Sequence, residues 1–243
     1  PLSHSLSPLI HNAEFKRLDL PYAYLRWELA PEGLQFFMQA LRMMKIHGLS
    51  VTIPHKQTVM GFLDHIEPSA QEIGAVNTVY LEGNTLVGRN TDMEGFLDPL
   101  MDRDLPDSAL VLGAGGAARA VLAGLKRLSI DRIGVANRTR KNAAALAKEC
   151  GVLLVDWEER DSFGPGLLIN STPLGMSGTL ADQSPWPKEC FDASMIAYDL
   201  VYNPLQTRFL REARAGGCMI IDGLSMFIGQ ASIQFNTWTG QDM

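Results

Sequence analysis

Two kinds of apolar periodicity run along the chain, and together they predict helices alternating with strands. Residues 31–44 carry apolar side chains every three or four positions, which is typical of an amphipathic helix. The apolar runs 75–80 and 85–88 flank Glu82-Gly-Asn84, a turn sequence typical of a hairpin. In the same half of the chain we also expect helices at 6–17, 55–66 and 93–101, and strands at 22–29 and 49–53.

The second half of the chain has a more regular pattern. After a polar, proline-containing stretch at 102–107, which predicts a linker, short apolar runs alternate with helical repeats. This alternation predicts a parallel, doubly wound sheet with helices on both faces. The expected strands are 108–112, 132–136, 152–155, 166–170, 195–200 and 218–221, and the expected helices are 116–128, 140–150, 206–215 and 226–238.

The turn between the first strand and helix of this half has the glycine spacing of a dinucleotide site. In Leu110-Val-Leu-Gly-Ala-Gly-Gly-Ala-Ala-Arg119, Gly113 permits a tight turn and Gly115 lets backbone N–H groups approach a pyrophosphate. The amino end of the following helix favours negative charge. A glycine-rich turn without a ligand is the alternative, but the position between an expected strand and helix favours the nucleotide site.

The residues after the next expected strand indicate which cofactor fits. An NAD site needs an acidic side chain about 20 residues after the glycine turn, to accept a hydrogen bond from the ribose 2′-hydroxyl. The chain instead has Asn137-Arg-Thr-Arg-Lys141. Arg138 can stack on adenine and pair with a 2′-phosphate, so the pattern favours NADP(H). The alternative is a solvated basic helix start, although cations there oppose the helix dipole.

Composition narrows the class of partner. With 243 residues, of which 46% are hydrophobic, the chain can bury one large core or two small ones. Its net charge of −6 argues against nucleic acid and anionic membranes as partners. Cations interrupt the longest apolar region, 109–128, so we expect no membrane span. Three cysteines without CxxC spacing, and no signal peptide, lead us to expect a cytoplasmic protein.

Three clusters in the first half place small polar side chains and single charges near the ends of expected strands. They are His4-Ser-Leu-Ser-Pro8, Val51-Thr-Ile-Pro-His-Lys56, and Gly74-Ala-Val-Asn-Thr78 with Asn90-Thr-Asp92. Clefts in α/β folds form at strand ends, so this half is expected to hold whatever reacts with the cofactor.

These clusters and four later motifs resemble the shikimate dehydrogenase family, from Pro1 to about Gly240. The later motifs are Asn137-Arg-Thr139, Asn170-Ser-Thr-Pro-Leu-Gly-Met176, Tyr198-Asp-Leu-Val-Tyr-Asn-Pro204, and Asp222-Gly-Leu-Ser-Met226 with Gln230. The resemblance implies an oxidoreductase of aromatic amino acid biosynthesis that reversibly reduces 3-dehydroshikimate to shikimate with NADPH. We expect shikimate and 3-dehydroshikimate as the small-molecule partners, and we expect the protein to be a monomer or a homodimer.

The resemblance also implies a role for each candidate residue. Lys56 and Asp92 would be the catalytic pair beside the reacting C3 oxygen. Ser5 and Ser7 would hold the substrate carboxylate, and the ring hydroxyls or carboxylate would be bound by Thr52, Asn77, Tyr202 and Gln230. The cofactor would be held by Gly113, Ala114, Gly115, Gly116, Ala117, Asn137, Arg138 and Thr139, with Leu200 and Gly223 lining the nicotinamide.

The chemistry of these residues is consistent with those roles. Reduction of a ketone needs a hydride donor and a proton donor at one carbonyl group. The expected helix at 55–66 would place Lys56 in its first turn, within reach of the helix dipole. Taken singly, each residue also has a purely structural reading: Asp92 as an N-cap, Lys56 as a surface lysine, Ser5 and Ser7 as loop or capping residues. Asn77 in a strand could likewise satisfy neighbouring backbone groups.

The chain departs from the family pattern in three places. Ser50 stands where the family usually has Asn, and its shorter side chain could alter a contact that positions the lysine loop. Asn142 stands where members often have a second phosphate-binding Arg, for which Arg140 or Lys141 can substitute. The strand and Gly-Asn pair that normally precede Pro1 are not in this chain, and a substrate domain without that strand would be less stable.

We therefore expect a two-domain α/β enzyme with its active site in the cleft between the domains, which domain closure would complete. Residues 1–92 would form a substrate-binding domain with a mixed sheet, on which the C-terminal helix at 225–243 packs back. Residues 93–224 would form a Rossmann-like, doubly wound NADP-binding domain. No metal site is expected, because the five histidines show no ligand spacing: His4, His11, His47, His55 and His65.

Two other functions stay open at this point. A quinate/shikimate dehydrogenase that prefers NAD is one, although the chain has no acidic residue after Ala136. A non-catalytic NADPH-binding module is the other, although such a module has no need of Lys56 and Asp92.

Overall fold

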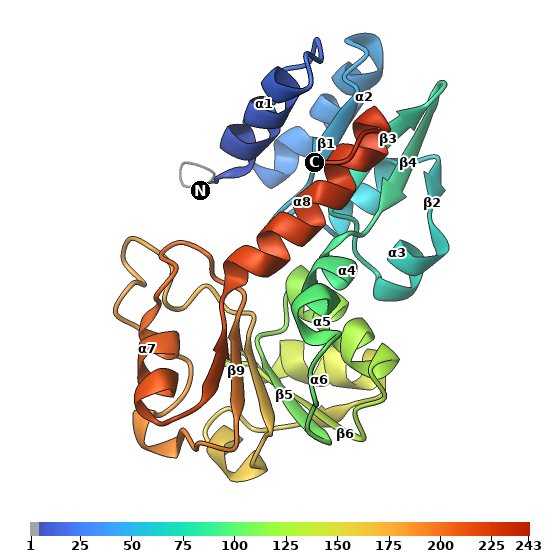
Figure 1. Ribbon diagram of the computed structural model, residues 1–243. Helices are drawn as coiled ribbons and strands as arrows, with labels where there is room; N and C mark the ends of the chain where they lie inside the picture. The colour runs from blue at the N-terminus through green and yellow to red at the C-terminus, as the bar shows by residue number, and fades with distance from the viewer. Residues whose placement is uncertain (1–4) are drawn as a thin grey trace. The chain divides into compact units, whose positions relative to one another are not determined.

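The computed structural model describes residues 5–243, and the chain divides into two compact units. The first unit contains the chain up to Thr91 together with Gln230–Met243, and the second is Asp92–Gly229. Helix α8 (Gly223–Thr239) contributes to both, since the division falls between Gly229 and Gln230 (Figure 1). His4, from the first polar cluster, lies outside the described residues.

The first unit is built on a four-stranded sheet in the order β1-β3-β4-β2. Strands β3 (Thr78–Glu82) and β4 (Thr85–Arg89) form the expected antiparallel hairpin, and Gly83 in its turn adopts a φ of +62°. Strand β1 (Gly48–Ser50) pairs antiparallel with β3, whereas β2 (His65–Ile66) pairs parallel with β4. The sheet is therefore mixed, as expected.

Three of the helical elements pack against this sheet in one apolar core. The expected amphipathic helix is α2 (Leu34–Met43), whose Leu34, Met38 and Leu41 are buried with residues of the hairpin. The other helical elements of the first unit are α1 (Ser7–Arg17), α3 (Pro68–Ile73), and the 3-10 helices η2 (Pro31–Gly33) and η3 (Thr58–Phe62).

The strand expected at 22–29 is wrong, because this segment of the described chain pairs with no other strand. The side chain of Asn12 takes the place of a partner strand. Its Oδ1 accepts a hydrogen bond from the Tyr24 N–H at 2.8 Å, and its Nδ2 donates to the Tyr24 carbonyl at 2.9 Å. A helix side chain thus satisfies backbone groups that the apolar alternation had suggested would bond to a sheet.

The helix expected at 55–66 is also wrong. Residues 58–62 form only the 3-10 helix η3, and β2 follows it. The carboxylate of Asp64 accepts a hydrogen bond from the Leu86 N–H at 2.7 Å, and the Asp64 N–H donates to the Leu86 carbonyl at 3.0 Å. Pairing with β4 therefore wins over the helical periodicity. Helix α3, which no apolar repeat indicated, begins with Pro68 at a position that favours proline.

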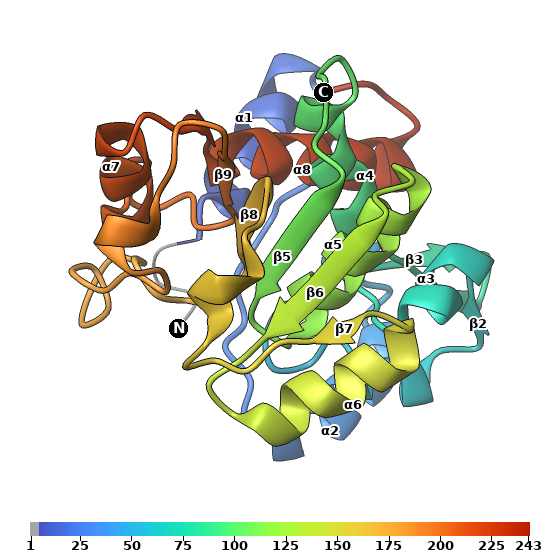
Figure 2. The same cartoon turned by 90° about the horizontal axis from the view of Figure 1, so that it is seen from below.

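The second unit is a six-stranded sheet in the order β10-β9-β8-β5-β6-β7, and every pairing is parallel. Its strands are β5 (Ser108–Leu112), β6 (Arg132–Ala136), β7 (Leu153–Leu154), β8 (Leu167–Asn170), β9 (Ile196–Asp199) and β10 (Met219–Ile221). Its helices are α4 (Asp92–Leu97), α5 (Gly116–Arg127), α6 (Arg140–Cys150) and α7 (Arg208–Ala215), with the 3-10 helices η4 (Asp98–Leu100), η5 (Arg160–Phe163) and η6 (Lys188–Cys190). The expected doubly wound parallel sheet is confirmed (Figure 2). The polar stretch 102–107 is a loop inside this unit.

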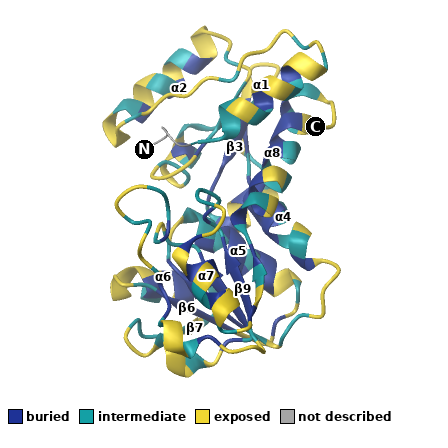
Figure 3. Cartoon of the chain, turned by 60° about the vertical axis from the view of Figure 1, so that its left-hand side comes forward, coloured by how far each residue is buried: buried dark blue, intermediate teal, exposed yellow. Residues whose placement is uncertain are grey.

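Successive side chains along the strands point to opposite faces of the sheet, and each face has its own apolar core. Val111 packs with α4, α5 and α6, while its neighbours Leu110 and Leu112 pack with α7. Because both faces are covered, the central strands are buried almost throughout, as the dark colour of β6 and β9 in Figure 3 shows. This burial leaves the strand ends and their loops as the places where polar side chains can gather.

In the first unit, aromatic rings join α1 to the end of α8. The ring of His11 is fully buried, stacks on Tyr24 with centroids 4.7 Å apart, and lies 5.3 Å from the ring of Trp238. Phe15 stacks on Phe235 of α8 at 5.3 Å. Neither ring nitrogen of His11 has a hydrogen-bond partner among the described residues. Burial lowers the pKa of His11 to about 4, so the imidazole is neutral at pH 7.

This buried imidazole should make the protein less stable in acid. The pKa of His11 falls from 6.5 in the unfolded chain to about 4 in the folded one. Above pH 6.5 the imidazole is neutral in both states and does not reduce the free energy of unfolding, whereas between pH 6.5 and 4 protonation of the unfolded chain lowers that free energy. Between pH 7 and pH 5 we expect this residue to cost about 2 kcal/mol of unfolding free energy. Urea unfolding at the two pH values measures it.

Two variants serve as controls for this pH dependence. His11→Phe keeps an aromatic ring in the stack but cannot titrate, so the acid loss should shrink by that amount. His65 is exposed, and His65→Gln should leave the loss unchanged. An unchanged acid loss in His11→Phe would show that His11 is not its source.

Candidate active site

Lys56 and Thr52 lie on a loop whose two ends are hydrogen-bonded to the start of β3. The Val51 N–H donates to the Asn77 carbonyl at 2.7 Å, and the Val76 N–H donates to the Lys56 carbonyl at 2.8 Å. The loop therefore brings Thr52, Lys56 and Asn77 together within the first unit. Thr52 is exposed and Lys56 is half-buried in a turn ahead of η3. The α-helix expected to begin here is absent, so Lys56 does not lie in the first turn of a helix and the expected effect of a helix dipole on it is wrong.

Asn77 is buried and joins two other parts of the first unit. Its Oδ1 accepts a hydrogen bond from the Thr91 N–H at 2.8 Å, and its Nδ2 donates to Thr91 Oγ1 at 2.9 Å. Thr91 Oγ1 in turn donates to the carbonyl of Gln230 at 3.1 Å. The side chain of Asn77 thus satisfies neighbouring groups, as its structural reading anticipated, and it also links the Lys56 loop to half-buried Gln230 of α8.

Ser50, where the family usually has Asn, has a defined partner in this chain. Its Oγ donates to Oε1 of Gln234 at 2.6 Å. Gln234 is buried, and its Nε2 donates to Thr78 Oγ1 at 2.9 Å and to the Asn77 carbonyl at 3.2 Å. A short side chain at position 50 therefore still connects the strand before the lysine loop to Asn77, through an amide on α8.

Ser5 and Ser7 lie at the amino end of α1, and both are half-buried. The Ser7 N–H donates to Ser5 Oγ at 3.3 Å. The N-cap position of α1 is Leu6, whose side chain cannot accept a hydrogen bond. Pro8 has no N–H, and the Leu9 and Ile10 N–H groups donate to the Leu6 carbonyl. The two serine hydroxyls, rather than the backbone of this helix start, are therefore the donors that could bind a carboxylate.

Asp92 is the first residue of α4 and is 5% exposed. It belongs to the second unit, whereas Lys56 belongs to the first. An acidic residue in the first turn of a helix is favoured by the helix dipole. That interaction stabilises the helix start whether or not Asp92 also has a chemical role.

The glycine turn of the second unit has the geometry that its spacing suggests. Gly113 has a φ of +116°, and a Cβ there would lie 2.5 Å from Ser171 Oγ, so only glycine fits. Gly115 is the N-cap of α5, and a Cβ on it would meet no atom within 4 Å. The other turn positions, Ala114, Gly116 and Ala117, lie beside it.

The donors at this turn fit a dinucleotide. The N-cap Gly115 offers no side-chain oxygen to the first N–H groups of α5, so these groups are available to an anion. Open space in front of Gly115 lets phosphate oxygens come close to the backbone. The residues at the end of β5 could therefore hold a pyrophosphate.

The two arginines of the basic segment after β6 differ in whether they have an ion-pair partner. Asn137 Nδ2 donates to the Thr139 carbonyl at 3.0 Å, which closes the turn before α6. Arg140 pairs with Asp156, with Nε and Oδ2 3.3 Å apart. Arg138 is exposed and has no ion pair within the described part of the chain. Arg138 is therefore the guanidinium best available to a phosphate, and no carboxylate stands where NAD recognition would need one.

Leu200 and Gly223, which are far apart in the sequence, come together in the second unit. A Cβ at Gly223 would lie 2.6 Å from the Leu200 carbonyl oxygen, so the start of α8 approaches this backbone as closely as glycine allows. Two residues later, the ring of Tyr202 stacks on Phe227 of α8 with centroids 4.4 Å apart. Leu200 and Tyr202 are half-buried, so each keeps an accessible surface.

Sequence reasoning missed the residues that hold these candidates in place. Thr91 and Gln234 organise the hydrogen bonds around Asn77, and Asp199 accepts hydrogen bonds at the end of β9. Thr91 and Asp199 stand inside quoted motifs, so their position was a signal. Gln234 had none, because its partners are more than 150 positions away in the chain.

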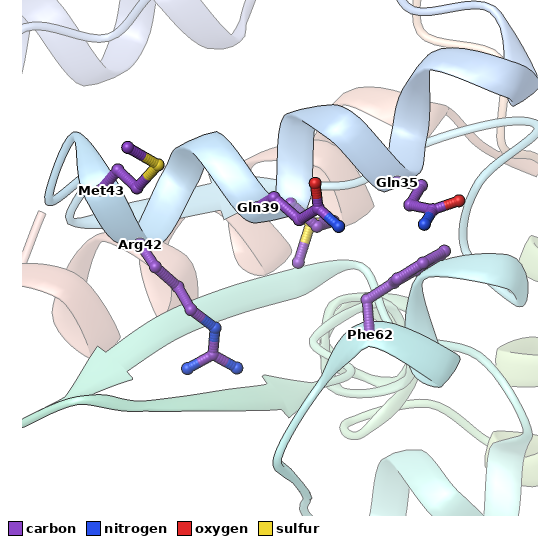
Figure 4. A pocket seen from close by; sticks show the side chains of 6 residues that line it. Gln35, Gln39, Arg42, Met43 and Phe62 are labelled. Carbon is purple, nitrogen blue, oxygen red and sulfur yellow. The ribbon is translucent and has the colours of Figure 1, made fainter.

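A groove elsewhere on the first unit contains none of the candidate residues. It is lined by Gln35, Met38, Gln39, Arg42, Met43 and Phe62. Figure 4 shows Arg42 pointing away from Gln35 towards the hairpin, and its Nη2 donates to Asp64 Oδ2 at 2.7 Å. Over residues 5–243, no group of three His, Cys, Asp or Glu residues is arranged to hold a metal ion. No helix in that range is long and apolar enough to cross a membrane.

Comparison with known proteins gives one consistent result. The model of the shikimate dehydrogenase substrate binding domain matches residues 1–79, and the model of shikimate / quinate 5-dehydrogenase matches residues 102–160. A shikimate dehydrogenase (NADP(+)) of Pelobacter propionicus is 46% identical, over all of this chain and 89% of the relative.

Solved structures agree in fold. Shikimate 5-dehydrogenase of Thermus thermophilus, in complex with NADP(H) and shikimate, is 40% identical with a TM-score of 0.89, over all of this chain and 91% of that one. A quinate dehydrogenase of Corynebacterium glutamicum in complex with NAD is 30% identical with a TM-score of 0.89, over all of this chain and 92% of that one. The identities over the full chain, and the motifs assembled above, establish that the chain belongs to the shikimate dehydrogenase family.

Proposed function

We propose that this protein reversibly reduces 3-dehydroshikimate to shikimate with NADPH, in the pathway of aromatic amino acid biosynthesis. The observation that carries the proposal is that the two ends of the Lys56 loop are hydrogen-bonded to the neighbouring residues Val76 and Asn77, which brings the lysine to a segment with polar side chains suited to a ring of hydroxyls. The family to which the chain belongs supports the same reaction. The first unit would be the substrate-binding domain and the second the NADP-binding domain.

Each candidate residue then has a specific task. The Lys56 ammonium donates a proton to the C3 oxygen during reduction and takes one back during oxidation. Asp92 accepts a hydrogen bond from the substrate hydroxyl and orients the ammonium. Ser5 and Ser7 donate hydrogen bonds to the substrate carboxylate. The ring hydroxyls or the carboxylate are bound by Thr52, Asn77, Tyr202 and Gln230.

The second unit would hold the cofactor. Bound NADPH supplies the hydride, which the protein itself cannot provide. Gly113, Ala114, Gly115, Gly116 and Ala117 would bind the pyrophosphate through the N–H groups at the start of α5. Asn137, Arg138 and Thr139 would bind the adenosine end, and Leu200 and Gly223 would line the nicotinamide. We expect the protein to act in the cytoplasm, as a monomer or homodimer.

An absorbance assay of nicotinamide reduction tests the proposal with four substrate pairs: shikimate or quinate, each with NADP⁺ or NAD⁺. We expect turnover with shikimate and NADP⁺, and at most weak turnover in the other three. The quinate dehydrogenase solved with NAD has the same architecture, so the discrimination between these pairs comes from individual side chains. Strong turnover with quinate or NAD⁺ would contradict the proposed specificity. Binding of NADPH without any turnover would contradict the enzymatic role and favour a non-catalytic module.

A further inference from the structure

Asp199 is the last residue of β9, and its carboxylate is fully buried. It accepts hydrogen bonds from three different segments of the second unit. Asn170 Nδ2 at the end of β8 and the Val201 N–H donate to Oδ1 at 2.9 and 3.0 Å. Thr207 Oγ1, at the start of α7, donates to Oδ2 at 2.5 Å. One carboxylate therefore joins two strand ends and a helix start.

The partners of Asp199 extend its influence into both neighbouring loops. Oδ1 of Asn170 accepts from Thr172 Oγ1 at 2.7 Å and from the Thr172 N–H at 2.9 Å. Asn170 Nδ2 also donates to the Leu174 carbonyl at 3.1 Å. Thr207 Oγ1 accepts from the Leu210 N–H at 3.2 Å and so caps α7. Loss of the carboxylate would leave buried donors unpaired in each of these segments.

The residues held in this way are the ones proposed to face the nicotinamide and the substrate. The Leu200 N–H donates to the Asn170 carbonyl at 2.9 Å, and the next N–H, that of Val201, donates to Asp199. On its other side, the Leu200 carbonyl lies against Gly223 of α8. The 200–202 backbone is thus fixed from both sides, and its far end carries Tyr202, stacked on Phe227.

We propose that Asp199 is a positioning residue for catalysis, which holds Leu200 and Tyr202 where the nicotinamide and the substrate ring meet. This inference rests on the proposed function. The ionised carboxylate suits the site, because in that form it only accepts hydrogen bonds and all three of its partners donate. Burial raises the pKa of Asp199 to about 7, opposed by the hydrogen bonds from Thr207, Val201 and Asn170. The fold therefore keeps a carboxyl group where an apolar side chain would be cheaper to bury.

Three variants of the whole two-unit chain test this role. Asp199→Ala removes all three hydrogen bonds, and Asp199→Asn keeps Oδ1 as an acceptor for Asn170 and Val201. Leu167→Ala is the matched control, since Leu167 is fully buried at the opposite end of β8 from Asn170 and makes no hydrogen bond to Asp199. Steady-state kinetics give kcat and the KM for shikimate. Binding of 2′-phospho-ADP-ribose, which lacks only the nicotinamide, reports the rest of the cofactor site without the nicotinamide pocket.

If Asp199 is a positioning residue, its loss should impair catalysis but not binding of 2′-phospho-ADP-ribose. In Asp199→Ala, kcat should fall and the KM for shikimate should rise, together lowering kcat/KM by about 10–100-fold, as small displacements of reacting groups do. Binding of 2′-phospho-ADP-ribose should stay within about twofold. Asp199→Asn should recover kcat/KM to within about threefold of the unmodified chain, because the acceptor is retained. Leu167→Ala should lose a similar amount of thermal stability with kcat/KM little changed.

The proposal is overturned if Asp199→Ala keeps normal kcat/KM, if Leu167→Ala loses as much activity, or if 2′-phospho-ADP-ribose binding falls equally. Should Asp199→Ala not fold, Thr207→Val removes one donor at nearly constant shape and should raise the KM for shikimate at least about threefold. Amide hydrogen exchange at 200–202 is a readout that does not depend on activity, and it should quicken in Asp199→Ala but not in Leu167→Ala. If the unmodified chain lacks turnover, the proposed function fails, and this exchange still decides the positioning role.

Discussion

Replacing Lys56 by alanine should lower turnover of shikimate with NADP⁺ by about 10²–10⁴-fold, the usual worth of a positioned acid–base group. The affinity for NADP⁺ should stay within about twofold, because the proposed cofactor residues all lie in the second unit and Lys56 lies in the first. Progress curves of nicotinamide absorbance give the turnover. Fluorescence titration of the same preparation with NADPH gives the affinity.

Two further lysine variants separate chemistry from packing. Lys56→Met keeps the length of the side chain but not the ammonium, so it should be about as inactive as Lys56→Ala. Lys16 is an exposed lysine in the last turn of α1, in the same unit, and Lys16→Ala should leave turnover within about twofold. Equal loss of turnover and of NADPH binding in Lys56→Ala would make Lys56 a structural residue and contradict its catalytic role.

The second unit could be predicted from the sequence because its signals are local. Strands β5, β6, β8 and β9 are short, mostly buried runs, and β5, β6, β9 and β10 are each followed by an α-helix. The Gly113 turn has a backbone requirement of its own, a φ of +116°. Parallel sheets buried on both faces produce apolar runs that need little context to interpret. The parallel direction of the six strands then follows from strand–helix alternation, whereas their order along the sheet was not predicted.

The first unit was less predictable because contacts between distant segments override local periodicity. Asn12 of α1 satisfies the backbone of Tyr24, so an alternating segment stays outside the sheet. Asp64 bonds to Leu86, so a segment with helical periodicity ends as a strand. Neither contact can be recognised in a stretch of about 11–18 residues, which is the length of sequence over which hydrophobic periodicity is measured.

The candidate site divides in the same way. The residue types of the cofactor turn and of Asn137-Arg-Thr139 are informative on their own, since glycine and arginine have restricted uses there. The residues that orient the site are less visible: Gln234 reaches Asn77 and Thr78 from α8, and Asp199 gathers donors from three segments. Buried hydrogen-bond networks depend on how helices and strands pack, and the spacing of sequence motifs does not predict that packing.

Replacing Arg138 by alanine should weaken NADPH binding by about 10–100-fold and leave NADH binding within about twofold. The only difference between the two cofactors is the 2′-phosphate, and a hydrogen bond to a charged group contributes about 1.5–3 kcal/mol. Arg138 is exposed beyond the end of β6 without an ion-pair partner among residues 5–243, so nothing on the protein competes with the phosphate. Titration with each reduced cofactor at low salt measures the two affinities.

Arg140→Ala is the matched control, since it removes the same charge two positions away. Arg140 pairs with Asp156, so its loss should weaken NADPH binding less than about threefold. Raising the salt concentration should narrow the gap between Arg138→Ala and the unmodified chain, because exposed charges are screened. If Arg138→Ala weakens NADH as much as NADPH, its contact is with a group that both cofactors share, such as the adenine ring. If Arg140→Ala has the larger effect, the 2′-phosphate replaces Asp156 as the partner of Arg140. In that case Arg140, and not Arg138, selects NADP(H).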